Sequence, residues 1–292
     1  MNISRVPPVG LALAAIVLWG LFPIFWKQLA HIDPLEVLAH RIIWAVPFLA
    51  VILFLTISSK EIVSACKPWN KLIPLAASAV MITLNWGLYI WAMGENKIVE
   101  ASMGYFLAPL INVSFGVLFF KEKLHITQWF AILIAACAVI GLFLAREIAP
   151  WLALYLAGSF AAYSAIRKKA SQDAVVGLFF ETAVLTPFAI GLVIYKINIG
   201  TSVVYLTNLP TTIMLAAAGV ITVLPLWLWV SGCRKINLST AGLLFYLTPT
   251  IQFFVGIFIY NEPLPLTDLI AFSGIWLALT VLAMNSYKSQ TT

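Results

Sequence analysis

The chain alternates between long apolar stretches and short polar gaps along its whole length. A membrane-spanning α-helix needs about 20 apolar residues to cross a hydrocarbon core roughly 30 Å thick. Stretches of that length, each free of long polar interruptions, predict ten membrane-spanning helices. They are expected at residues 7–27, 35–56, 72–93, 98–120, 126–145, 150–167, 174–195, 210–232, 237–260 and 266–285.

The composition agrees with a membrane protein and excludes a soluble one. The 292 residues are 62% hydrophobic and 10% charged, and their mean hydropathy is +1.01. A soluble domain is about 45–50% apolar and about 25% charged, so this chain has too little polar surface to coat an aqueous core. The first apolar run is too long for a signal-peptide core, and we interpret it as an uncleaved first helix. We therefore expect an all-α integral membrane protein.

The distribution of basic residues predicts the orientation in the membrane. Cytoplasmic loops of membrane proteins carry an excess of Lys and Arg. If the N-terminus is cytoplasmic, the cytoplasmic segments hold twelve basic residues and the outside segments hold four. We therefore predict that both termini are cytoplasmic. The twelve are Arg5, Lys60, Lys67, Lys71, Lys121, Lys123, Arg167, Lys168, Lys169, Arg234, Lys235 and Lys288, and the four are Lys27, Lys97, Arg146 and Lys196.

The two halves of the chain resemble each other at a shift of 140 residues. Five helices per half is an odd number, so the second copy would enter the membrane from the opposite side. Inverted repeats of this kind are typical of secondary transporters, whose binding site lies where the repeats meet. We predict two five-helix repeats, residues 7–145 and 150–285. The aligned pairs include Lys27 with Arg167, Asp33 with Asp173, Pro47 with Pro187, Pro109 with Pro249, Gly116 with Gly256, Glu122 with Glu262, and Asn112 with Gln252.

Several stretches of sequence are similar to one family of bacterial membrane proteins. They are Trp19-Gly20, HRIIW at 40–44, NWGLYIW at 85–91, EASMGYFLAPL at 100–110, RKK at 167–169, LSTAGLLFYLTPT at 238–250, and Glu262. Together they resemble the RarD group, the chloramphenicol-sensitive proteins, in the EamA branch of the drug/metabolite transporter superfamily. The resemblance implies ten helices in two inverted EamA repeats and a location in the bacterial inner membrane. It also implies a central cavity lined by the first four helices of each repeat, but it names no substrate.

Arg41 is the strongest candidate for a substrate-binding residue. Ionisable residues inside membrane helices cost roughly 2.5–3.5 kcal/mol and are therefore rare without a function. Arg41 would lie roughly 9 Å inside the membrane, with His40 beside it and Trp44 one turn along the helix. A guanidinium could grip a carboxylate or phosphate, with Trp44 as an aromatic wall. The alternative is that Arg41 extends outward to the lipid head groups.

Glu181, the repeat mate of Arg41, is the candidate for gating or proton coupling. It would lie near the opposite membrane face, so that the two residues are roughly 12 Å apart along the membrane normal and do not pair directly. Burial favours the neutral form of a carboxyl group, which suits proton exchange. The alternative is a structural carboxylate bonded to a nearby basic residue such as Lys168.

Polar residues in other helices complete the candidate site. Asn85 and Tyr89 are four residues apart and share one helix face, either as a cavity wall or as interhelical hydrogen-bonding groups. Asn112 and Gln252 are amides at matching positions of the two repeats, each following a proline. Pro109 and Pro249 are expected to interrupt their helices as hinges or to kink them simply. Glu122 and Glu262 are each expected to stabilise the N-terminus of the following helix.

The remaining residue patterns narrow the class of function. The net charge of +6 is spread over short loops, which argues against nucleic-acid binding. The scattered cysteines and histidines have no metal-ligand spacing, and nucleotide-binding and hydrolase motifs are absent from the sequence. We therefore expect no cofactor, no metal and no enzyme. The cysteines are Cys66, Cys137 and Cys233, and the histidines are His31, His40 and His125.

These patterns favour a secondary transporter that moves a small metabolite, such as an amino acid or a related compound, and drugs are also candidate cargo. A flippase-like carrier of a lipid-linked head group is the alternative, and a cavity open sideways to lipid would favour it. The expected partners are the lipid bilayer, the small-molecule substrate and a coupling proton. We expect a monomer or a homodimer.

Overall fold

A computed structural model describes residues 6–56, 72–94, 98–146, 151–170, 172–203, 209–261 and 265–291, and within these ranges it contains helices and loops without strands. Each predicted membrane span coincides with helical structure that begins within one residue of the expected boundary. The helices are α1 (Pro8–Gly20), α2 (Phe22–Trp26), α3 (Pro34–Thr56), α5 (Ile73–Gly94), α6 (Ile98–Phe120), α7 (Ile126–Arg146), α8 (Trp151–Lys169), α9 (Ala174–Asn198), α10 (Leu209–Cys233), α11 (Leu238–Phe245), α12 (Leu247–Tyr260) and α13 (Leu266–Thr291), with a 3-10 turn at Lys27–Leu29.

Helical segments of this protein are long and apolar enough to cross a membrane. Within the described residues, six meet both criteria, and three more helices contain shorter apolar stretches. The helix α8 is less apolar because it ends in Arg167, Lys168 and Lys169. The protein is therefore an all-α, multi-pass membrane protein. The six are Pro8–Leu29, Pro34–Leu55, Ile126–Ala145, Ala174–Asn198, Leu209–Cys233 and Leu238–Tyr260.

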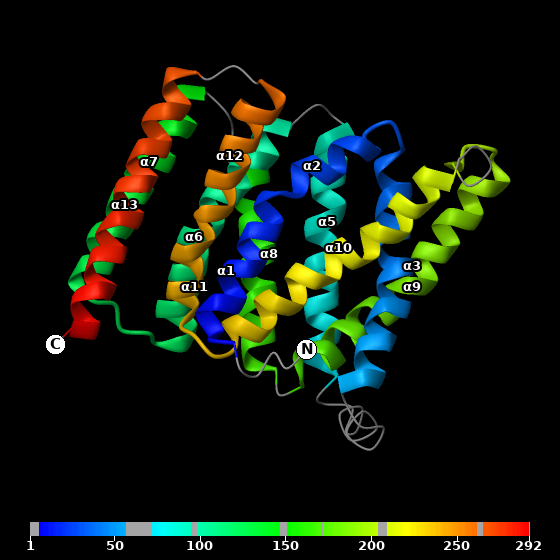
Figure 1. Ribbon diagram of the computed structural model, residues 1–292, viewed down its shortest axis with the longest axis horizontal. Helices are drawn as coiled ribbons and strands as arrows, with labels where there is room; N and C mark the ends of the chain where they lie inside the picture. The colour runs from blue at the N-terminus through cyan, green and yellow to red at the C-terminus, as the bar shows by residue number, and fades with distance from the viewer. Residues whose placement is uncertain are drawn as a thin grey trace.

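The helices run up and down between two ends of one bundle (Figure 1). The helix α1 begins and α13 ends on the same side, which we call the N-terminal end, and α3 begins at the opposite end. The helices α7 and α13 pack side by side at one edge, and α3 packs between α9 and α10 towards the other edge. Between them, α1, α6, α8 and α11 surround the centre of the bundle.

Small residues let neighbouring helices approach closely, as is usual in membrane bundles. A Cβ atom placed on Gly219 in α10 would lie 2.5 Å from the carbonyl carbon of Trp44 in α3. A Cβ on Gly232, near the end of the same helix, would lie 2.7 Å from the carbonyl oxygen of Pro8. These two glycines therefore fix α10 against both α3 and α1.

Two helix ends share an uncommon backbone conformation. Lys121 follows α6 with a φ of 53°, and Asn261 follows α12 with a φ of 51°. Residues other than glycine seldom adopt this left-handed region. They are the two such non-glycine residues in the described part of the chain, and they are 140 residues apart.

Candidate functional site

A hollow lies among α5, α6, α8 and α11, near the centre of the bundle. Its cavity volume is about 30 Å³, and the larger empty space of about 310 Å³ between its lining atoms includes volume open to the surroundings. Two of its lining residues, Tyr89 and Leu156, lie near the helix ends at the opposite end of the bundle. The hollow is therefore displaced away from the N-terminal end. Its lining residues are Asn85, Tyr89, Gly104, Tyr105, Ala108, Leu156, Phe160 and Phe245.

Aromatic rings form one wall of the hollow. Phe160 from α8 and Phe245 from α11 have ring centroids 5.2 Å apart. Trp19 and Trp229 pack behind them, with centroid distances to Phe245 of 5.6 Å and 5.3 Å. Such tilted and edge-on contacts stabilise the packing beyond the area they bury. The four rings therefore form one packed aromatic cluster, of which Phe160 and Phe245 line the hollow.

Polar side chains form another part of the lining. The rings of Tyr89 and Tyr105 are 6.1 Å apart. Asn85 donates hydrogen bonds from its amide nitrogen to the Leu156 carbonyl oxygen at 2.8 Å and to the Ser159 hydroxyl at 3.0 Å. Asn85 thus joins α5 to α8 while it also lines the hollow, so both roles considered from the sequence are compatible with its position.

Arg41 lies beside the tyrosine wall and interacts electrostatically with Tyr89 and Tyr105. Its Nε donates a hydrogen bond to the Thr222 hydroxyl at 2.9 Å. Its guanidinium carbon lies 4.5 Å from the centroid of the Trp26 ring and 4.9 Å from that of Trp86. Cation–π contacts of this kind hold a guanidinium in an apolar setting. The aromatic neighbours of Arg41 therefore come from α2 and α5.

The other predicted substrate-binding residues lie away from the lining of the hollow. Trp44 is 41% exposed, and both ring nitrogens of His40 are buried without a hydrogen-bond partner. The Asn112 side chain is fully buried with its amide unpaired, and Gln252 donates to the Trp19 carbonyl oxygen at 3.1 Å. The structure therefore brings Arg41, Asn85 and Tyr89 together and leaves these four apart from them.

The two prolines at matching positions differ in their effect on the backbone. The helical segment 238–260 is interrupted at Tyr246, between α11 and α12 and shortly before Pro249. By contrast, α6 continues through Pro109 without interruption. The predicted break therefore occurs near Pro249 and not at Pro109, which is accommodated within a continuous helix.

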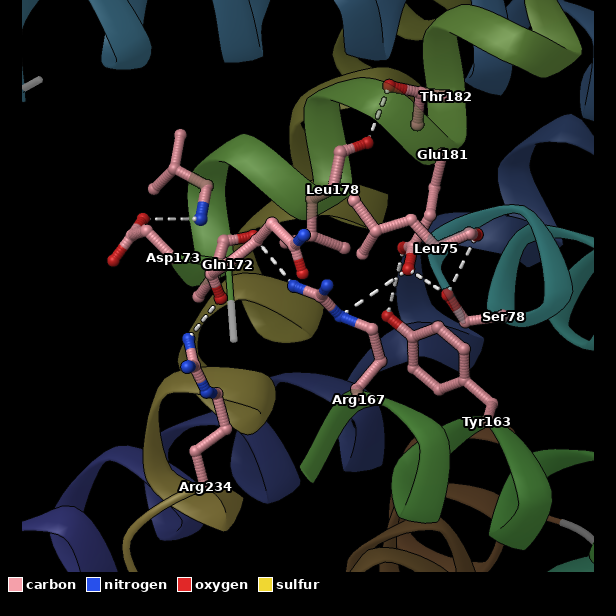
Figure 2. Close-up of polar contacts among 12 residues, drawn as sticks. Leu75, Ser78, Tyr163, Arg167, Gln172, Asp173, Leu178, Glu181, Thr182 and Arg234 are labelled. Carbon is pink, nitrogen blue, oxygen red and sulfur yellow. Dashed lines mark hydrogen bonds and ion pairs between the residues drawn. The ribbon is translucent and has the colours of Figure 1, made fainter. Parts of the chain in front are cut away.

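Glu181 belongs to a buried polar cluster formed by α5, α8 and α9 (Figure 2). Its carboxylate lies 3.4 Å from the Arg167 Nε. Ser78 donates a hydrogen bond to one carboxylate oxygen, and the Tyr163 hydroxyl donates to the other at 3.4 Å. Arg167 also donates to the Ala174 carbonyl oxygen at 3.1 Å. The cluster therefore pairs a cation with a carboxylate inside the protein, where a single charge would be costly.

The basic partner of Glu181 is Arg167, whereas the sequence suggested Lys168 as the nearby base. Arg167 is 1% exposed and points back between α8 and α9. A Cβ on Gly177 would overlap its guanidinium, so the absence of a side chain there makes room for the arginine. In the sequence, Arg167 is interpreted only as one of the cytoplasmic basic residues that set the orientation. Gly177, the small residue that faces Arg167 from α9, is the feature of the sequence that could have indicated a buried arginine.

At the N-terminal end of the bundle, Glu122 joins the end of α6 to α11. Its carboxylate accepts hydrogen bonds from the Leu238 N–H at 2.7 Å, the Ser239 N–H at 2.9 Å and the Ser239 hydroxyl at 2.6 Å. Lys168 adds an ion pair at 3.4 Å. The expectation that Glu122 stabilises the next helix is therefore wrong, because it stabilises the N-terminus of α11 instead. Glu262 lies outside the described residues.

Two contacts link α3 to the second half of the chain at the opposite end. Asp33 pairs with Lys196 at 3.0 Å, and buried Glu36 accepts hydrogen bonds from the Ser202 hydroxyl and from the Val203 N–H at 3.0 Å. Partial burial raises the pKa of Asp33, but its hydrogen bond with Lys196 and its backbone hydrogen bonds outweigh this and hold that pKa below its ordinary value. The described residues contain no group of three or more His, Cys, Asp or Glu side chains that could hold a metal ion.

Comparisons with known proteins agree with this arrangement. Residues 7–144 match the EamA-like transporter family. The uncharacterized transporter YojE of Bacillus subtilis is 35% identical over 277 residues, which are 94% of this chain and 92% of that protein. Protein RarD of Escherichia coli is 33% identical over 292 residues, which are 97% of this chain and 95% of that protein. The Pseudomonas aeruginosa chloramphenicol-sensitive protein RarD is 29% identical over 286 residues, which are 96% of this chain and 94% of that protein.

A solved crystal structure has the same fold, with a TM-score of 0.68 at 16% identity, and covers 94% of this chain and 96% of that chain. At this identity the likeness concerns the fold alone. The curated relatives, by contrast, are similar along nearly the whole length of both proteins and have transporter or RarD names. The chain belongs to the RarD group of the EamA-like transporters, in the drug/metabolite transporter superfamily, and is a membrane transporter.

Proposed function

We propose that this protein is a secondary transporter of a bacterial inner membrane that moves a small metabolite by alternating access. An amino acid or a related compound is the proposed cargo, with drugs as further candidates. The observation that carries the proposal is that helices from both halves of the chain, α5 and α6 from the first and α8 and α11 from the second, line one central hollow. A site shared by two halves can open to either side when the halves tilt against each other.

The proposed inverted repeats, residues 7–145 and 150–285, are supported by residues 140 positions apart. Asp33 accepts hydrogen bonds from the first N–H groups of α3, and Asp173 does the same for α9. Tyr105 and Phe245 are repeat mates that both line the hollow. The repeat mates Lys121 and Asn261 share the left-handed backbone conformation.

Helix packing also supports this symmetry, because contacts occur in matching pairs. The packing of α6 on α8 corresponds to that of α12 on α1, and the packing of α10 on α3 corresponds to that of α5 on α9. Likewise, α1 packs on α10 as α8 packs on α5. Ten membrane crossings with both termini in the cytoplasm are the topology that we propose.

The state of the two ends supports alternating access. Glu122 joins α11 at the N-terminal end, while the hollow is displaced towards the opposite end. We assign this arrangement to a state that is closed on the cytoplasmic side. In the return step, the contact of Glu122 with α11 would break. The opposite end, where Asp33 and Glu36 already link α3 to the second half of the chain, would then close over the empty site.

The roles of individual residues follow from their positions. Substrate contact is proposed first for Arg41, Asn85 and Tyr89, around the hollow. Glu181 is proposed as the gating or proton-coupling group, with Arg167 as its counter-charge in the closed state. Further substrate contacts in the course of transport are proposed for His40, Trp44, Asn112 and Gln252, and hinges at Pro109 and Pro249.

Ligand-dependent thermal stability of the purified protein tests the proposal. The ligands are amino acids, nucleotides, polyamines, organic acids, phenicol antibiotics and lipid precursors. A ligand at 100 times its dissociation constant stabilises the folded state by about 2.7 kcal/mol. A soluble ligand that stabilises the protein, and whose effect is lost in Arg41→Ala, supports a small-molecule carrier. Stabilisation by lipid precursors alone would contradict it and favour the flippase-like carrier.

Uptake into proteoliposomes tests the coupling role of Glu181. If Glu181 exchanges protons, Glu181→Gln abolishes the dependence of uptake on an imposed pH gradient while exchange of labelled for unlabelled substrate continues. An unchanged pH dependence in Glu181→Gln would show that the carboxylate has a structural role only.

A further inference from the structure

Arg41 carries a positive charge that the described part of the protein does not neutralise. The Thr222 hydroxyl is its hydrogen-bond partner, and no described carboxylate lies within 4.0 Å of its guanidinium. The arginine of the Glu181 cluster, in contrast, is paired. An ionised side chain inside a membrane protein normally has an opposite charge or a ligand as its partner. The missing partner of Arg41 is therefore the feature to explain.

The charge lies directly beside the hollow. The Arg41 guanidinium carbon lies 4.9 Å from the centroid of the Trp86 ring, and Trp86 follows the lining residue Asn85 in α5. Tyr89 and Tyr105, which line the hollow, both interact electrostatically with Arg41. None of the eight lining residues carries a charge. The electrostatic potential at this wall is consequently positive, and the described lining offers no carboxylate to hold an ammonium group.

The apolar residues of the hollow indicate which uncharged part the ligand would have. Besides the tyrosines, Phe160 and Phe245 line the hollow, and the Phe245 ring packs against Trp19 and Trp229. The rings of Trp26 and Trp86 position the Arg41 guanidinium through cation–π contacts. These contacts leave the N–H groups that do not bond to Thr222 available to a ligand. The Arg41 guanidinium can donate two hydrogen bonds to a carboxylate, and Phe160 and Phe245 can pack against an aromatic ring. A ligand that carries both groups would therefore suit this site.

We propose that the transported substrate is an organic anion with a flat apolar body. Its carboxylate lies at the tyrosine wall and pairs with Arg41, and its body packs on Phe160 and Phe245. This inference rests on the proposed transport function and narrows its substrate from small metabolites in general to net-negative aromatic acids. Zwitterionic amino acids and amines bind more weakly, because the positive charge of Arg41 repels their ammonium group.

Four probes with one skeleton test the charge preference in the unmodified protein. They are 3-phenylpropionate, L-phenylalanine, 3-phenylpropan-1-ol and 2-phenylethylamine, and their dissociation constants are measured by calorimetry in detergent. A charge-assisted pair with Arg41 predicts that 3-phenylpropionate binds about tenfold or more tightly than the neutral alcohol. L-Phenylalanine is expected between these two, and 2-phenylethylamine is expected to bind most weakly. Equal or tighter binding of the alcohol or the amine overturns the inference.

Variants locate the origin of the preference. Arg41→Gln is expected to bring 3-phenylpropionate and the alcohol to equal affinity, and Arg41→Lys to retain part of the preference. Lys196→Gln is the matched control, because it removes a cation that pairs with Asp33 and does not line the hollow. An anion preference that survives in Arg41→Gln, or that is lost equally in Lys196→Gln, overturns the role of Arg41.

Transport measurements separate the two proposals. If proteoliposomes take up amines or neutral solutes but no aromatic acid, the proposed function holds and the substrate inference is wrong. If 3-phenylpropionate binds with the predicted dependence on Arg41 but no solute crosses the membrane, the binding site stands and the proposed transport cycle fails.

Discussion

The carboxylate of Glu122 is predicted to hold the N-terminal end of the bundle closed and to contribute to stability. Glu122→Gln removes the charge and replaces one acceptor oxygen with an NH2 group that faces N–H donors. The side chain is 7% exposed, so water does not replace the lost contacts. One buried amide proton of Ser239 therefore loses its acceptor in the variant.

The size of the effect follows from the bonds that change. Glu122 accepts three hydrogen bonds, between 2.6 and 2.9 Å long, and has an ion pair with Lys168 at 3.4 Å. Hydrogen bonds to charged groups contribute about 1.5–3 kcal/mol each, and an unsatisfied buried donor costs about 1–3 kcal/mol. Because the glutamine keeps one acceptor, we expect a loss of about 2–4 kcal/mol. Ser239→Ala, which removes only the hydroxyl bond, is expected to cost about 1 kcal/mol.

Thermal unfolding, followed by tryptophan fluorescence in detergent, measures the loss. We expect a Tm about 5 °C or more below that of the unmodified protein, at roughly 2–4 °C per kcal/mol. Lys123→Gln, an exposed substitution in the same loop, is the control and is expected to stay within about 0.5 kcal/mol. Equal Tm values for Glu122→Gln and Lys123→Gln would refute the reasoning.

The pH dependence provides an independent check. Burial raises the pKa of Glu122, but the hydrogen bonds from Ser239 and Leu238 and the charge of Lys168 outweigh this and hold it below the ordinary value. A carboxyl whose pKa is depressed by folding stabilises the protein above its unfolded pKa, and this contribution disappears as pH falls through its folded pKa. The Tm difference between the unmodified protein and Glu122→Gln is therefore expected to be full at pH 7 and to shrink below about pH 4. A difference that grows with acidity would contradict this sign.

Other contacts give further predictions, each measured by thermal unfolding. Arg167→Met leaves Glu181 buried without its cation and is expected to cost about 3–5 kcal/mol, with part of this loss recovered in the double variant that also carries Glu181→Gln. Gly177→Ala places a methyl group on the Arg167 guanidinium and is expected to cost about 1–3 kcal/mol, whereas Gly191→Ala, with open space around its Cβ, is expected to be neutral or stabilising. Asp33→Asn is expected to cost at most about 1 kcal/mol because its ion pair is partly exposed, and because the pKa of Asp33 is lowered, this cost is expected to disappear as pH falls below about 4.

The positions of the helices could be predicted from sequence because membrane spans depend on local composition. Apolar length alone gave the start of α5 at Ile73 and of α9 at Ala174 to within one residue. The resemblance to the RarD group was likewise carried by local motifs and agrees with the relatives found. The break at Tyr246 was less predictable, because a proline in a helix can be accommodated, as Pro109 is, or can accompany an interruption, as Pro249 does.

The partners of the polar residues depended on tertiary packing and could not be predicted in the same way. Glu122 bonds to α11, 116 residues away from Leu238 in sequence, because α6 packs against α11. In the sequence, Arg167 is one basic residue beside two lysines. It becomes the buried partner of Glu181 only because α8 packs against α9 at Gly177, which leaves room for its guanidinium. The indoles around Arg41 come from two other helices, whereas a sequence pattern indicates neighbours on the same helix.

Solvent accessibility of the hollow from each side of the membrane tests the proposed transport cycle most directly. Ala108 lines the hollow, so a single cysteine is placed there as Ala108→Cys in a protein whose native cysteines are replaced by serine. The protein is reconstituted into vesicles in a known orientation and treated with a membrane-impermeant thiol reagent from one side at a time. Alternating access predicts labelling from both sides, slowed by bound substrate on each side, without leakage of the reagent across the membrane. Labelling from one side alone, whatever substrate is present, would contradict the account.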